Sequence, residues 1–111
     1  MDLLQGTLEM LVLRTLGLGP LHGYAISKAI RAQSNDVLEI EFGSLYPALK
    51  RLEVKGWVSA KWEVSEANRR MKVYRLTDVG RKQLRQEHSK WAEFASAVAR
   101  IMGPLAEGGK G

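Results

Sequence analysis

Apolar residues recur at helical spacing in two segments near the start of the chain. The first predicted helix covers residues 5–18, and its apolar stripe consists of Leu4, Leu8, Leu11 and Leu18, widened by Val12 and Leu16. The stretch "GLGPLHG" then interrupts the pattern, because glycine and proline are strong breakers. A second helix is predicted over residues 24–33, with Ile26, Ala29 and Ile30 facing inward. After it, "VLEIEF" (37–42) alternates like a short strand or an extended connector.

The stretch "GSLYPALKRL" predicts a third helix over residues 44–55. Its inward face is expected to consist of Leu45, Leu49 and Leu52. Ser44 is the expected N-cap, since its hydroxyl can accept a hydrogen bond from a first-turn amide. Pro47 would then be the third helical residue, where its missing N–H has no intrahelical partner. The proline therefore does not argue against a helix, and a glycine just past residue 55 ends it.

Beyond residue 56 the period changes from helical spacing to strict alternation. Residues 57–64 and 71–76 alternate, and "SEANRR" between them is a polar turn, so the two segments predict a β-hairpin. Thr77 is the expected N-cap of a last helix that runs to Met102 and ends before a glycine and a proline.

Three helices, a hairpin and a long helix form the plan of a winged helix-turn-helix with an added C-terminal helix. In that fold the third helix enters the major groove of DNA and the hairpin, called the wing, reaches the adjacent backbone. The predicted class is therefore mainly α with a small β-hairpin. The expected organisation is a winged helix domain over residues 1–76, a dimerisation helix over 77–102 and a flexible tail over 103–111.

Length and composition fit one compact domain. The chain has 111 residues, of which 45% are hydrophobic and 26% charged. It has no cysteine, which excludes a disulfide framework, a thiolate zinc site and cysteine catalysis. Gln5, Glu9 and Arg14 interrupt the apolar opening, so it is neither a spanning helix nor a signal peptide. We expect a cytoplasmic protein that does not bind membranes.

Positive charge is concentrated in the middle of the chain. The net charge is +5, and residues 44–75 alone hold eight basic and three acidic groups. Residues 1–43 are acidic overall, with three basic and five acidic groups. Such a basic region on a small domain is typical of a polyanion binder, although a basic solvated surface is the alternative. The basic excess falls on the third helix and the wing.

These two elements supply the candidate DNA contacts. On the third helix the outward or lateral residues are Ser44, Tyr46, Pro47, Lys50 and Arg51, and on the wing the cations are Arg69, Arg70 and Lys72. A tyrosine hydroxyl and these cations can bind phosphates, and lysine or arginine can also bind base edges. In the alternative interpretation, Tyr46 packs on the hairpin and the cations only solvate the surface.

No residue pattern indicates catalysis or a metal site. His22 has no second histidine at metal-ligand spacing, and the chain shows neither a nucleophile–base pair nor a glycine-rich phosphate loop after a strand. His88 lies far away on the last helix, where it fits an interface. We therefore expect a protein that is not an enzyme and needs no cofactor.

The last helix carries a heptad pattern. The residues of this seam are Leu84, His88, Trp91, Ala95, Val98 and Met102, with Phe94 and Ile101 broadening the face. A hairpin and three short helices cannot cover a helix of about 39 Å. The seam thus predicts a two-fold homodimer, the alternative being a helix that folds back on its own domain. Trp91 either packs in this interface or lines a slot for a flat aromatic ligand.

Long motifs in this order resemble those of the PadR family of transcriptional regulators. The most specific are "LQGTLEMLVLRTLGLGPLHGYAISKAI", "EFGSLYPALKRLEVKGWV" and "RRMKVYRLTDVGRKQL". The resemblance covers residues 3–102, and the single C-terminal helix is similar to the shorter subgroup. It implies a winged helix domain with a C-terminal dimerisation helix, in a ligand-responsive repressor that binds a palindromic operator near its own or a neighbouring promoter.

The resemblance also implies roles for individual residues. The "GSLYPAL" helix and the wing face DNA in the family, which applies here to Ser44, Tyr46, Pro47, Lys50 and Arg51, and to Arg69 and Arg70. Trp91 is the counterpart of a tryptophan that stacks a planar ligand in some members. Two other functions remain open at this point: a winged helix adaptor that binds proteins, and a dimer that sequesters a ligand without binding an operator.

Overall fold

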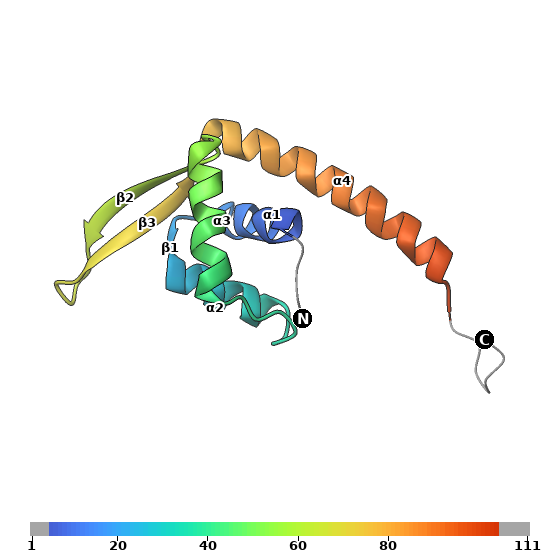
Figure 1. Cartoon of the computed structure of the whole chain (residues 1–111), viewed down its shortest axis with the longest axis horizontal. Coiled ribbons are helices and arrows are strands. Elements are labelled where there is room, and N and C mark those ends of the chain that lie inside the picture. The colour runs from blue at the N-terminus through green and yellow to red at the C-terminus, as the bar shows by residue number, and fades with distance from the viewer. Residues whose placement is uncertain (1–4, 105–111) are drawn as a thin grey trace.

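The computed structural model describes residues 5–104 and has the expected mostly helical fold with a small antiparallel sheet. The elements in order are α1 (Gln5–Leu16), β1 (Leu21–His22), α2 (Gly23–Gln33), α3 (Phe42–Val54), β2 (Val58–Val64), β3 (Arg70–Leu76) and α4 (Asp78–Met102). In Figure 1, α1, α2 and α3 form the body, while the β2–β3 hairpin and α4 project from it in opposite directions. The fold class predicted from the sequence is confirmed.

One hydrophobic core lies among the three short helices and the base of the sheet. Its largest fully buried side chains are Leu13, Ile26, Leu45, Leu49, Leu52 and Val12. The leucines of α3 point inward as their spacing predicts, so the opposite face of that helix is left for solvent. The first helix ends at Leu16, two residues earlier than predicted, because Leu18 belongs to the following turn and is exposed.

The sheet has three strands in the order β1-β3-β2. The hairpin is confirmed, with Val58 opposite Leu76 at its base and Val64 opposite Arg70 near its tip. No residue pattern predicted β1, which pairs with β3 through Leu21 and His22 only. Two residues are too few for alternation to be visible, and this strand forms because β3 offers a free edge.

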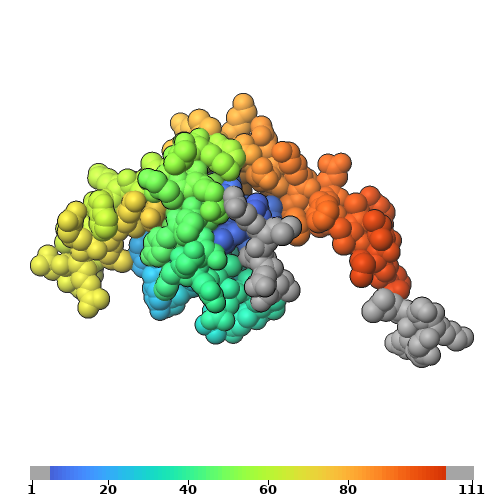
Figure 2. Space-filling view, viewed as in Figure 1, coloured from blue at the N-terminus to red at the C-terminus, as the bar shows by residue number. Residues whose placement is uncertain are grey.

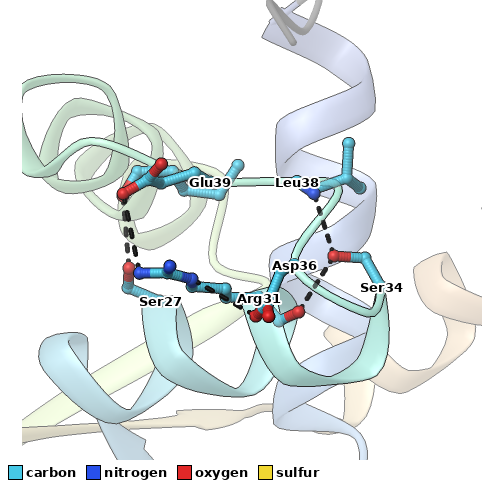
Figure 3. A network of polar contacts seen from close by, with 7 residues as sticks. Ser27, Arg31, Ser34, Asp36, Leu38 and Glu39 are labelled. Carbon is cyan, nitrogen blue, oxygen red and sulfur yellow. Dashed lines mark hydrogen bonds and ion pairs between the residues drawn. The ribbon is translucent and has the colours of Figure 1, made fainter.

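Residues 34–41, which connect α2 to α3, contain no strand, so of the two expectations for 37–42 only the extended connector stands. Side chains of α2 hold this connector, as Figure 3 shows. Arg31 lies between two carboxylates, 3.3 Å from Asp36 and 3.7 Å from Glu39. Ser27 donates a hydrogen bond to the carbonyl of Ile40, and Ser34 accepts one from the amide of Leu38. The start of α3 is thereby fixed relative to α2.

The start of α3 differs from the prediction. The helix begins at Phe42 with Glu41 at the N-cap, so Ser44 is not the cap but lies inside the first turn. Pro47 is consequently the sixth helical residue, not the third. An N–H there would have bonded to the carbonyl of Gly43, so the proline does remove a helical hydrogen bond. The buried leucines on either side of the proline compensate, because they fix the helix against the core.

Thr77 caps α4 as predicted and also anchors it to the base of the wing. Its hydroxyl accepts a hydrogen bond from the amide of Gly80 at 3.0 Å and donates one to the carbonyl of Gly56 at 2.7 Å. Gly80 packs so closely on the carbonyl of Trp57 that a side chain there would overlap it. The base of α4 is therefore held rigidly, and Gly103 ends the helix with a φ of 52°.

Beyond its first turns α4 leaves the body of the molecule. Leu84 packs against the core, whereas the large apolar residues from Trp91 onward are exposed. The described residues extend over 60 × 28 × 21 Å, and Figure 2 shows the helix as an arm with free space beneath it. The alternative in which the helix folds back on its own domain is thus not what this protomer adopts. Most of the tail predicted for 103–111 lies outside the described residues.

Candidate nucleic-acid interface

The outer face of α3 is exposed and lies opposite its buried leucines. Gly43, Pro47 and Lys50 follow one another at intervals of four and three residues along this face, and all three are exposed. Within residues 5–104, Lys50 forms no ion pair, so its ammonium is available to an external anion. Ser44 is also exposed. We refer to Gly43, Pro47 and Lys50 as the front of α3.

Three aromatic rings flank the front of α3 on the side of α2. The ring of Phe42 lies 6.2 Å from that of Tyr24 and 5.8 Å from that of Tyr46, and each of the three is about half exposed. Tyr46 rests on Gly23 at the start of α2, where any Cβ would lie 2.7 Å from the tyrosine hydroxyl. The absence of a side chain at Gly23 therefore makes room for the tyrosine ring.

The opposite flank of α3 carries an ion network with α1. Glu9 is buried, with its side chain only 8% exposed, and its carboxylate accepts hydrogen bonds from Arg51 Nε at 2.6 Å and Lys55 Nζ at 2.9 Å. Burial raises the pKa of Glu9, but the two hydrogen bonds and charges outweigh it and hold the pKa below its usual value. The Nε of Arg51, a predicted DNA contact, is thus engaged within the protein.

Sequence reasoning had treated Glu9 only as an interruption of an apolar segment. A glutamate on the buried face of a helix, with two cations four residues apart on a later helix, was the available signal. How α1 and α3 cross cannot be read from the sequence, so the sequence did not indicate that the glutamate contacts these two cations. The network fixes the rotation of α3 about its axis, so it determines which residues form the front of that helix.

The wing places two of its predicted cations at the tip, and the third, Lys72, lies two residues further along β3, opposite Trp62. Arg69 lies in the turn and Arg70 begins β3, and neither forms an ion pair within the described part of the chain. Asn68 adopts a φ of 59° in this turn, a conformation that asparagine tolerates. Lys72, by contrast, is half-buried, and its ammonium lies 3.4 Å from a carboxylate oxygen of Glu53 on α3.

Trp62 is a surface residue that sequence reasoning missed. Alternation had placed it on the same face as Val58, and only the base of that face is covered by the core. Further along β2 the strand leaves the core, so Trp62 is 56% exposed. The guanidinium carbon of Arg70 lies 5.0 Å from its ring centroid, a cation–π distance that orients the arginine.

A groove of about 450 Å³ separates the tip of α3 from the wing. It is lined by Tyr24 and Tyr46 from the helices, by Trp62 and Tyr74 from the strands, and by the cations Arg70 and Lys72. Burial raises the pKa of Tyr74, so this phenol stays neutral near pH 7. The groove combines aromatic walls with positive charge. This arrangement suits a sugar–phosphate backbone, because the rings contact sugars while the cations bind phosphates.

The seam of α4 divides into a covered and an open part. Leu84 belongs to the domain core, whereas His88 is exposed and lines a shallow pocket with Arg14. Further out, Trp91 is 45% and Ile101 83% exposed, and the ring of Trp91 lies 5.8 Å from that of Phe94. The exposed large apolar residues from this point to the end of the helix are Trp91, Phe94, Val98, Ile101 and Met102.

Two other kinds of site receive no support. Among residues 5–104, no group of three or more acidic, histidine or cysteine side chains is placed to hold a metal ion. The helices in the same range include none that is both long and apolar enough to cross a bilayer.

Comparison with known proteins agrees with this surface. Residues 12–86 match the family described as the transcriptional regulator PadR-like family. A PadR family transcriptional regulator from Eggerthella lenta has 33% identity and a TM-score of 0.75, with 90% of this chain and 85% of that chain covered. A transcriptional regulator from Clostridium thermocellum has 28% identity and a TM-score of 0.80, with 88% and 92% covered.

Relatives are also found by sequence alone. An uncharacterized protein of Lysinibacillus sphaericus is 31% identical over 102 residues, which cover 91% of this chain and 93% of that protein. A 37.1 kDa protein encoded in a Streptomyces fradiae transposon is 41% identical over 99 residues, but this chain spans only 25% of its length. With the family match over residues 12–86, these relationships establish that the chain belongs to the PadR-like family and is a non-enzymatic, DNA-binding transcription regulator.

Proposed function

We propose that the protein is a homodimeric repressor that binds a palindromic operator and responds to a ligand. The observation that carries the proposal is the free front of α3, with its unpaired Lys50, beside a wing whose tip carries Arg69 and Arg70. In a winged helix this helix occupies the major groove while the wing follows the adjacent backbone. The aromatic groove between the two elements would then hold one strand of the duplex.

The proposed contacts differ in kind. Lys50 reaches base edges or phosphates from the front of α3, whereas Arg69 and Arg70 bind phosphates and fix the register. Tyr46 and Ser44 donate hydroxyl hydrogen bonds, and Pro47 stiffens the surface that meets the duplex. Three further contributors are secondary: Arg51 through its terminal nitrogens, Lys72 after exchanging Glu53 for a phosphate, and the α3 amides. Glu41 at the N-cap makes no side-chain hydrogen bond to the first turn, so these amides are not capped by it, but its negative charge close to the helix start weakens them as phosphate ligands.

Dimerisation is proposed through the open part of the α4 seam. The arm formed by α4 leaves its own domain and carries a row of exposed apolar residues. Exposure of such a row to water is unfavourable. In the proposed dimer a second copy of the chain, related by a two-fold axis, covers it. Two α3 helices related by that axis would meet half-sites about one helical turn apart, roughly 34 Å. The palindromic operator follows from this symmetry.

Ligand response is proposed through the same arms. The angle between the two reading heads depends on how the α4 helices pack, so a ligand that binds one packing better shifts the protein toward or away from operator binding. Trp91 and Phe94 offer adjacent aromatic faces for a planar effector. Repression is the simplest output, because a bound dimer excludes polymerase from the promoter.

The test begins with selection of bound duplexes from random genomic fragments by the purified protein. Affinity for the selected duplex is then measured over a range of salt for wild type, Lys50→Ala and Lys82→Ala. Lys82 is an exposed lysine of α4, outside both α3 and the wing, and serves as the control. We expect Lys50→Ala to lower affinity at least tenfold and Lys82→Ala to leave it within twofold. A wild type without steep salt-dependent duplex binding would instead be the adaptor or the ligand-sequestering dimer.

A further inference from the structure

For most glycines that the structure describes, the fold itself explains why the residue is glycine. Gly19, Gly56 and Gly103 have φ between 52° and 145°, which disfavours other residues. A Cβ at Gly80 would overlap the carbonyl of Trp57, and a Cβ at Gly17 or Gly23 would lie within 3.0 Å of the side chain of Leu84 or Tyr46. At each of these six positions the fold itself disfavours a larger residue.

At Gly43 neither the backbone conformation nor a close neighbour within the protein explains the glycine. It lies inside α3 with an ordinary helical conformation, and a Cβ built on it meets no other atom within 4 Å. Alanine would therefore fit without strain and would make the helix more stable, because glycine has the greater conformational freedom to lose on folding. Gly6 is the one other such glycine in the described range, and it is the second residue of α1 as Gly43 is of α3.

The place of Gly43 indicates an external reason. It stands at the front of α3, one turn before Pro47 and two turns before Lys50, opposite the leucines that fix the helix in the core. The rings of Phe42 and Tyr46 rise beside it at a centroid separation of 5.8 Å. The bare backbone is thus the lowest point of a surface that has aromatic rings along its α2 side, so an object can approach the helix axis closely there.

We infer that Gly43 is the point of closest approach between α3 and the operator, and that its missing side chain sets how deeply the helix enters the major groove. This inference rests on the proposed use of α3 as the recognition helix. A methyl group at position 43 would hold the duplex away from the helix, so Lys50 and the wing cations could no longer reach it together. Stability is given up at this position for contact with DNA.

The experiment compares Gly43→Ala with its matched control Gly6→Ala in the full chain. Both variants add one methyl group at the second residue of a helix, into open space. Thermal unfolding followed by circular dichroism should show a rise in the midpoint of about 2–4 °C for each. Affinity for the selected duplex should fall at least tenfold for Gly43→Ala and stay within twofold of wild type for Gly6→Ala. Gly43→Leu should lose more than Gly43→Ala.

Each contrary result is distinguishable. Duplex affinity of Gly43→Ala within twofold of wild type, alongside a weakened Lys50→Ala, would overturn the inference about Gly43 and leave the recognition helix in place. A lowered thermal midpoint for Gly43→Ala would also overturn it, because the glycine would then have a structural reason. If Lys50→Ala and Gly43→Ala both bind the duplex as wild type does, α3 is not the recognition helix. The inference about Gly43 is then also wrong.

Discussion

The side-chain Nε of Arg51 lies 2.6 Å from a carboxylate oxygen of Glu9, and this contact joins α3 to α1. Lys50 precedes Arg51 in the chain but is rotated about 100° around the helix, so it faces outward, and it forms no ion pair with any residue that the structure describes. Two adjacent cations on one helix therefore have different surroundings. Arg51 positions the helix, and the ammonium of Lys50 is left available to a binding partner.

We expect Arg51→Ala to lower the free energy of unfolding by about 2 kcal/mol. The substitution leaves the buried carboxylate of Glu9 with Lys55 alone, and an undercompensated buried charge is costly, although partial exposure of the arginine reduces the loss. Lys50→Ala is the matched control and should change stability by no more than about 0.5 kcal/mol. Urea denaturation measures both, and equal stabilities for the two variants would contradict the structural role of Arg51.

The same ion network predicts a dependence of stability on pH. The pKa of Glu9 in the folded protein lies below the ordinary value of 4.5, so the folded state binds a proton less readily than the unfolded state. The stabilisation is complete above pH 4.5 and is lost as the pH falls through the lowered pKa. The Glu9→Gln variant has no carboxylate to protonate at this position. Its free energy of unfolding should therefore decline less steeply than that of wild type as the pH is lowered below 5. Parallel declines would show that Glu9 contributes nothing.

The sequence predicted the elements that residue periodicity controls. The leucines of α3, the alternation of β2 and the Thr77 cap each follow from local spacing, and each occurs as expected. The start of α3 was predicted wrongly because Ser44 is a strong cap by itself. The connector held by Arg31 places Phe42 in the helix first, so tertiary contacts decided where it begins.

The candidate interface could be predicted only in part, for a similar reason. Charge clustering located the wing cations, and the spacing of the leucines located the outward face of α3. The roles of Arg51 and Lys72 depend on acidic partners on other elements, Glu9 and Glu53, whose proximity only the fold determines. The exposure of Trp62 likewise depends on how far the hairpin extends past the core.

Removing both arginines of the wing tip should change the salt dependence of duplex binding. Each phosphate contact contributes roughly 0.9 to the slope of log affinity against log salt, so Arg69→Ala with Arg70→Ala should reduce the slope by about 2. Sequence preference should stay as in wild type, because phosphate contacts carry no base information. Titrations at several salt concentrations, with the selected and a scrambled duplex, measure both quantities. An unchanged slope would place the wing away from DNA.

Trp62 and Arg70 should act together. The ring holds the guanidinium at 5.0 Å, and an exposed cation–π contact is worth about 0.5–1 kcal/mol. Trp62→Ala should therefore weaken duplex binding about threefold in the wild-type background and have little further effect when Arg70 is already alanine. A double-mutant cycle on duplex affinity measures this coupling. Additive losses would mean that Trp62 contacts DNA, or supports the wing, independently of the arginine.

Val98→Glu on α4 should separate dimerisation from folding. The buried hydrophobic residues of the core all lie between Leu8 and Leu76, so the winged helix domain does not need a partner to fold. A glutamate within the exposed seam would be buried uncompensated in a dimer, and we expect a folded monomer that binds the operator at least a hundredfold more weakly. Val79→Glu is the control, since Val79 is exposed on the same helix but outside the seam. Sedimentation velocity measures the oligomeric state of both variants. A Val98→Glu protein that remains dimeric would refute this interface.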